Sequence, residues 1–182
     1  MKGIVFTEFL ELVETAFSPE MVDRIIADSL LPSGGAYTAI GTYDGAEMGR
    51  LVGALSKATA TPSGELLEIF GRHLFGRFVA LYPAFFAGCG SSFDFLPQVG
   101  NHIHFEVRKL YPDAELPAIT ATPIDADTME VIYQSPRCMA KLARGLIDGC
   151  IAHFRETIAV SEADRSGGAG ATVAFTLRRQ HA

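Results

Sequence analysis

The sequence of 182 residues contains no tryptophan and only three cysteines. Cys89, Cys138 and Cys150 are odd in number and widely spaced, and no two of them form a C-x-x-C motif. A disulfide framework needs paired cysteines, and a structural zinc site usually needs closely spaced ones. We therefore expect neither, and predict three reduced, partly buried thiols.

The chain also has no apolar run of membrane-spanning length, and Glu8, Glu11 and Glu14 interrupt the amino-terminal segment where a signal peptide would be apolar. Basic residues are few: 15 lysines and arginines against 21 aspartates and glutamates give a formal charge of -6. Nucleic-acid binders neutralise phosphates with basic side chains. We expect a cytoplasmic protein that binds neither membrane nor nucleic acid.

Apolar residues recur at helical spacing through the first part of the chain. Helices are predicted at 4–17, 19–26, 48–55, 63–78 with Ser63 as N-cap, and 93–110. The segment 63–78 has apolar residues on more than one face, which predicts a helix that is buried on two sides.

The pattern changes to alternation after Pro112. Two hairpins are predicted, from strands at 118–122 and 128–135 and from strands at 156–160 and 172–177, with a helix at 139–154 between them. The predicted class is α+β, in one domain spanning 1–182. A helical amino-terminal lobe (1–60) would pack on a lobe (61–182) that holds a small antiparallel sheet and helices.

Three polar side chains alternate at the end of the second predicted strand. Tyr133, Ser135 and Arg137 would emerge on one face of an extended segment. Two hydroxyls and a planar guanidinium suit one or two carboxylates, and Pro136 would leave the backbone there partly unpaired. The alternative is an edge strand with an ordinary surface arginine.

His104 lies within the predicted helix 93–110, beside Ile103 and Val107. A buried histidine either finds a hydrogen-bond partner, which is the usual outcome, or binds a ligand. Ligation of haem would also need a large apolar cavity. The thirteen phenylalanines would suit such a cavity, but a core built without tryptophan explains them equally well.

Over essentially its whole length the sequence resembles the haem-nitric oxide/oxygen binding (H-NOX) family. The resemblance rests on the opening Met1-Lys2-Gly3, on the segment 103–112, and above all on Tyr133-x-Ser135-x-Arg137, the family's hallmark. It implies ferrous haem b buried between the lobes, with His104 as the proximal iron ligand. The same resemblance implies that Tyr133, Ser135 and Arg137 hold the two haem propionates. His102 does not fall at the ligand position and is expected at the surface or behind the ligand.

The resemblance also implies which gases bind. Family members that hold oxygen use a distal tyrosine supported by a tryptophan and an asparagine, and the matching positions here are Leu142, Phe9 and Leu74. Bound oxygen carries partial negative charge, which an apolar pocket does not stabilise, whereas nitric oxide binds ferrous iron without such help. We expect nitric oxide and carbon monoxide to bind and oxygen to be excluded.

Four further pocket residues follow from the resemblance: Pro117, which would press on the haem, and the lining residues Val5, Phe78 and Leu146. In the family, nitric oxide weakens the bond between iron and histidine, and the amino-terminal lobe shifts. The implied signalling partner is a separate histidine kinase or diguanylate cyclase. Some bacterial relatives carry a zinc site near the carboxyl end, but residues 161–171 here contain neither cysteine nor histidine.

Three other functions stay open on the residues alone. A haem peroxidase would need a distal acid–base residue, and the distal positions are apolar. A thiol redox sensor would use Cys138, beside Arg137, or Cys150. A module for a lipid-like carboxylate would use Arg137 and an apolar cavity, with His104 incidental. The expectation is a sensor and not an enzyme.

Overall fold

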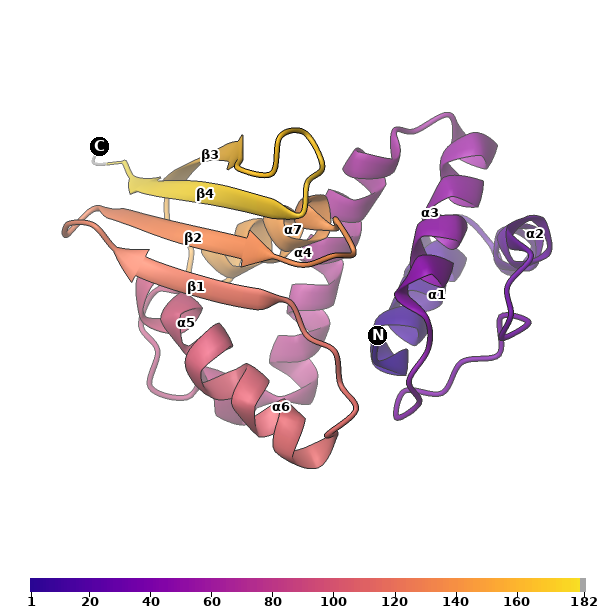
Figure 1. Cartoon of the computed structure of the whole chain (residues 1–182), viewed down its shortest axis with the longest axis horizontal. Coiled ribbons are helices and arrows are strands. Elements are labelled where there is room, and N and C mark those ends of the chain that lie inside the picture. The colour runs from indigo at the N-terminus through magenta and orange to yellow at the C-terminus, as the bar shows by residue number, and fades with distance from the viewer. Residues whose placement is uncertain (181–182) are drawn as a thin grey trace.

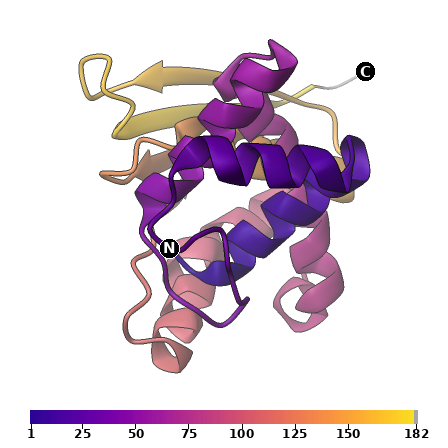
Figure 2. The ribbon, with the colours of Figure 1, turned by 90° about the vertical axis from the view of Figure 1, so that its right-hand side faces the viewer.

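The computed structural model describes residues 1–180. Three helices, α1 (Gly3–Ala16), α2 (Pro19–Ser29) and α3 (Gly45–Thr59), lie together on one side of the long helix α4 (Ser63–Leu81) (Figures 1 and 2). A 3-10 turn, η1 (Pro83–Phe86), then leads into a helical run made of α5 (Ser92–Gln98), η2 (Val99–Ile103) and α6 (His104–Leu110). Among the described residues, no helix combines the length and the apolarity needed to cross a membrane.

The second half of the chain forms one antiparallel sheet and one helix. The strands β1 (Ala118–Pro123), β2 (Thr128–Gln134), β3 (Ile158–Asp164) and β4 (Thr172–Arg179) are arranged in the order β1-β2-β4-β3. Both predicted hairpins are confirmed. Helix α7 (Ala140–His153) covers one face of the sheet and packs along α4 (Figure 1).

The amino-terminal motif has a steric explanation. Lys2 forms an isolated β-bridge with Thr42, and the amide of Gly3 donates to the carbonyl of Gly41 at 2.8 Å. A Cβ on Gly3 would lie 1.8 Å from the carbonyl oxygen of Thr38. Because no side chain fits there, glycine is needed for α1 to begin against this loop.

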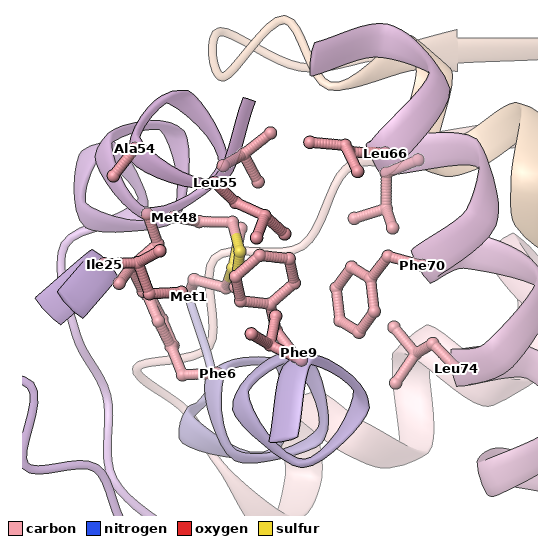
Figure 3. Close-up of a cluster of buried hydrophobic side chains, with 14 residues drawn as sticks. Met1, Phe6, Phe9, Ile25, Met48, Ala54, Leu55, Leu66, Phe70 and Leu74 are labelled. Carbon is pink, nitrogen blue, oxygen red and sulfur yellow. The ribbon is translucent and has the colours of Figure 1, made fainter. Parts of the chain in front are cut away.

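Helix α4 is buried on two sides, as its apolar pattern predicts. Leu66, Phe70 and Leu74 join the amino-terminal cluster of buried side chains (Figure 3), whereas Phe75 joins a second cluster formed with the sheet and α7. The close packing of α4 on α7 depends on glycine: a Cβ on Gly145 would lie 2.2 Å from the backbone oxygen of Glu68. Helix α4 thus belongs to both clusters, and the division into lobes at residue 60 stays a prediction.

Three local details differ from the sequence-based expectations. Ser63 is the first residue of α4 and not its N-cap, because Pro62 occupies the cap position without a side-chain hydrogen bond. The predicted helix 93–110 is interrupted by η2, a π-helical turn. Finally, β2 lies between β1 and β4, so the alternative of an edge strand is wrong.

Two neighbouring residues of α4 test this burial. The side chain of Phe70 is fully buried and packs edge-to-face on Phe9, whereas Ile69 is 40% exposed. Phe70→Ala should lower the free energy of unfolding by about 3–5 kcal/mol, because it removes apolar contacts and leaves a cavity. Ile69→Ala should lower it by about 1 kcal/mol or less. Urea unfolding of the haem-free chains measures both, and equal losses would contradict the orientation of α4.

Candidate functional site

His104 is the first residue of α6, directly after the π-helical turn. Its Nδ1 atom is buried and has no hydrogen-bond partner within residues 1–180. Burial, together with the charge of Arg108, lowers the pKa of His104 to about 4, although the nearby backbone of Pro117 raises this pKa. The imidazole is therefore neutral at physiological pH, and a neutral imidazole has a lone pair with which to bind a metal.

No second protein ligand accompanies this histidine. Within the described part of the chain, no three histidine, cysteine, aspartate or glutamate side chains converge as a metal site. One histidine is sufficient, however, for an iron whose equatorial ligands come from a porphyrin. The donor set thus fits a metal that arrives within a cofactor better than a bare ion.

The apolar residues expected around the haem, apart from Pro117, all lie in or against the amino-terminal cluster, and Leu146 also packs against the second cluster. Phe9, Leu74 and Leu142 are buried members of the amino-terminal cluster, and Val5, Phe78 and Leu146 pack against it. Figure 3 shows Phe9, Phe70 and Leu74 turned toward one another. The six residues come from α1, α4 and α7, so the fold brings together positions that are far apart in the sequence.

A buried charge lies beside this cluster but is already paired. Glu8 precedes Phe9 in α1, and its carboxylate is buried. The Nε atom of Arg77 donates to Glu8 Oε2 at 2.6 Å, and His73 Nε2 lies 3.7 Å from the same oxygen. Because the carboxylate is engaged by the guanidinium of Arg77, it is not available as a distal acid–base group. This pairing disfavours a peroxidase.

Tyr133, Ser135 and Arg137 lie at the end of β2 and in the turn after it. The hydroxyl of Tyr133 accepts a hydrogen bond from the amide of Met139 at 3.0 Å, and that of Ser135 accepts from the amide of Arg137 at 3.2 Å. Within residues 1–180, both hydroxyls act as acceptors in these bonds and neither donates its own proton. Both protons are therefore available to an anionic ligand.

The guanidinium of Arg137 is mostly buried, with 16% of its side chain exposed. It donates to the carboxylate of Glu115 at 2.9 Å and packs over the start of α3, where a Cβ on Gly45 would lie 2.8 Å from Arg137 Nε. The amino terminus is close by: burial, and next the charge of Arg137, lower the pKa of the Met1 ammonium. The Arg137 guanidinium, the amino terminus and the start of α3 therefore meet at this point, together with the carboxylates of Glu115 and Asp44.

Sequence reasoning did not identify Glu115 or Gly45 as neighbours of Arg137. Glu115 lies in an irregular segment 22 residues earlier in the chain, and Gly45 begins the distant helix α3, so neither has a periodic signal. His102, by contrast, is exposed at the surface as expected, where its ring contacts Phe85 edge-to-face.

Two hollows on the surface are distinct from these residues. One of about 380 Å³ lies between α4 and α7, and one of about 420 Å³ lies between α2 and α3. Neither is lined by a residue of the predicted haem site. The three cysteines are all free, and burial raises the pKa of the Cys150 thiol, which disfavours it as a redox sensor because the thiolate is the reactive form.

Comparison with known proteins gives one consistent result. The haem-NO-binding family matches residues 2–162. The structure of the ferrous unliganded H-NOX protein from K. algicida is 39% identical with a TM-score of 0.93, and the match covers 100% of this chain and 98% of that one. The H-NOX of Shewanella woodyi in the Fe(II)CO state is 37% identical, with a TM-score of 0.83 and coverage of 99% and 95%.

A more distant match shows the fold alone. The H-NOX protein from S. oneidensis in the Fe(II)NO state is 22% identical, with a TM-score of 0.90 and full coverage of both chains. No match was found among curated proteins.

The ion pair between Arg137 and Glu115 generates a prediction. Glu115 is 81% exposed and competes with any anion for the guanidinium. Glu115→Gln should therefore tighten the binding of haem by roughly two- to fivefold, a small effect because an exposed ion pair is weak. Titration of the haem-free protein with haemin measures this. Glu65→Gln in α4 changes the net charge equally and should have no effect. Unchanged or weaker binding in Glu115→Gln would contradict the competition.

Proposed function

Because the chain belongs to the haem-NO-binding family, whose H-NOX domains are haem-based gas sensors, we propose that it senses nitric oxide through ferrous haem b. The observation that carries this proposal is the neutral imidazole of His104, whose buried Nδ1 atom has no hydrogen-bond partner within residues 1–180. A buried nitrogen without a partner is costly in an ordinary core but is what an axial ligand requires.

Different residues would bind the iron and the propionates of the cofactor. His104 would be the single protein ligand of the iron, and Tyr133, Ser135 and Arg137 would bind the two propionates through two hydroxyl protons and a guanidinium. Pro117 would press on the haem from the segment that leads into β1. Haem, when bound, supplies an iron that binds diatomic gases.

Selectivity among gases would come from the absence of a hydrogen-bond donor among the distal side chains. Leu142, Phe9 and Leu74 carry no hydrogen-bond donor, and Val5, Phe78 and Leu146 extend the same apolar surface. Such a wall excludes water and gives no stabilisation to the partial negative charge of bound oxygen. Nitric oxide and carbon monoxide need no such donor, and the S. oneidensis and Shewanella woodyi structures with these two ligands support the assignment.

Signalling would use the bond from His104. His104 would be the one side chain that links α6 to an iron able to bind diatomic gases, so a change in this link would alter how α6 and the segment at Pro117 lie relative to α1 and α3. A change of this kind regulates a partner only if the partner binds the two states with different affinity. We propose a cytoplasmic role with a histidine kinase or a diguanylate cyclase as that partner.

A binding module for a lipid-like carboxylate is the second candidate, because the anion site around Arg137 would suit a fatty acid as well as a propionate. It predicts a protein that retains lipid and takes up no haem. The neutral imidazole of His104, whose buried Nδ1 atom has no hydrogen-bond partner within residues 1–180, favours haem over a lipid-like carboxylate.

Gas selectivity is tested at Leu142. The reduced, haem-loaded protein should bind nitric oxide and carbon monoxide but stay unliganded in air. Leu142→Tyr should increase the affinity for oxygen by about 10- to 100-fold, because one hydrogen bond to a charged group is worth about 1.5–3 kcal/mol. Leu142→Phe fills similar space without the hydroxyl and should behave like the wild type. Absorption spectra under defined oxygen pressures measure both, and an oxygen complex of the wild type in air would contradict the proposal.

A further inference from the structure

Gly100 lies in η2, four residues before His104, and seats this turn directly on the first strand. A Cβ on Gly100 would lie 2.0 Å from the carbonyl oxygen of Ile119 in β1 and 3.1 Å from its carbonyl carbon. Ordinary contact with a Cβ begins at 3.4 Å. Any side chain at this position therefore forces η2 and β1 apart.

Backbone conformation does not explain this glycine. The φ angle of Gly100 lies outside the left-handed region, in contrast to Gly88 and Gly170. Close approach of two backbones is thus the reason that a side chain is excluded here.

The contact joins the two segments of the proximal side. The amide of His104 donates to the carbonyl of Val99 across the π-helical turn, so Gly100 and His104 belong to the same hydrogen-bonded turn. On the other side, Ile119 lies two residues after Pro117, just inside β1. The Gly100–Ile119 contact therefore fixes how the segment that carries His104 sits against the segment that carries Pro117.

Resting on the proposed function, we propose that Gly100 is a positioning residue for the axial ligand. Because Gly100 has no side chain, η2 can pack directly on the carbonyl group of Ile119. This packing fixes the position of the His104 imidazole and therefore the strength of its bond to iron. The residue touches neither iron nor haem and acts through His104. A glycine that served packing alone would affect stability and leave the bond from His104 unchanged.

The test compares Gly100→Ala with Gly49→Ala, a glycine of α3 with no atom near its Cβ position. Both variants are loaded with haem, and the iron–histidine stretching band of the ferrous unliganded protein is recorded by resonance Raman. Gly100→Ala should shift the band, and Gly49→Ala should not. Transfer of haem to excess apomyoglobin should become about 10- to 100-fold faster in Gly100→Ala, which is typical when the support of a metal ligand is lost. An unshifted band with normal transfer overturns the proposal.

Free imidazole, supplied in place of the His104 side chain, distinguishes an effect of Gly100 on the position of His104 from a general change in the haem pocket. In His104→Gly supplied with imidazole, the ligand is no longer attached to the helix, so adding Gly100→Ala should leave the iron–imidazole band in place. A shift that persists in this background overturns the positioning role. If His104→Gly without imidazole keeps the wild-type spectrum, then His104 is not the ligand, and the proposed function fails as well.

A measurement on the unmodified chain covers the case in which Gly100→Ala does not fold. Hydrogen exchange of the haem-loaded protein is followed with and without nitric oxide. If the contact couples the two segments, amides of η2 and amides of β1 around Ile119 should change their protection together. A change in η2 with β1 unaltered, or no change in either, overturns the proposal.

Discussion

The neutral imidazole of His104 is the feature on which the proposed haem site depends. Burial and the charge of Arg108 disfavour the charged form of His104, and its Nδ1 atom has no hydrogen-bond partner in residues 1–180. Leaving a buried polar atom without a partner costs about 1–3 kcal/mol. In the proposed function, the apolar side chains of Phe9, Leu74 and Leu142, the guanidinium of Arg137 and the turn before His104 would support haem at this residue.

The fold supplies these features from separate parts of the chain. The distal residues belong to the amino-terminal cluster, and Tyr133 belongs to the cluster formed by the sheet and α7. Helix α4 contributes to both clusters, and Arg137 approaches Gly45 at the start of α3. The packing of α4 and the contact of Arg137 are therefore two physical connections between the sheet and the amino-terminal helices.

Much of this arrangement could be predicted from the sequence. Apolar periodicity indicated α4 and its burial on two sides, and alternation indicated both hairpins. The spacing of Tyr133, Ser135 and Arg137 predicted one face of an extended segment, but β2 ends at Gln134 and Arg137 lies in the turn that follows. Irregular and long-range contacts could not be predicted, because they leave no periodic pattern of side chains in the sequence. They include the π-helical turn, the packing of Gly100 on Ile119, and the approach of Gly45 and Glu115 to Arg137. The edge-strand alternative failed for a related reason, since strand order depends on the distant β4.

The central claim is that His104 is the iron ligand, and the most direct test is the absorption spectrum of the dithionite-reduced protein in three forms: wild type, His104→Ala and His102→Ala. The exposed His102 is the matched control, two residues away. The account predicts that wild type and His102→Ala share the spectrum of a five-coordinate, histidine-bound haem, and that His104→Ala loses this spectrum and regains it with added imidazole. A wild-type protein that takes up no haem, or an unchanged spectrum in His104→Ala, would contradict it.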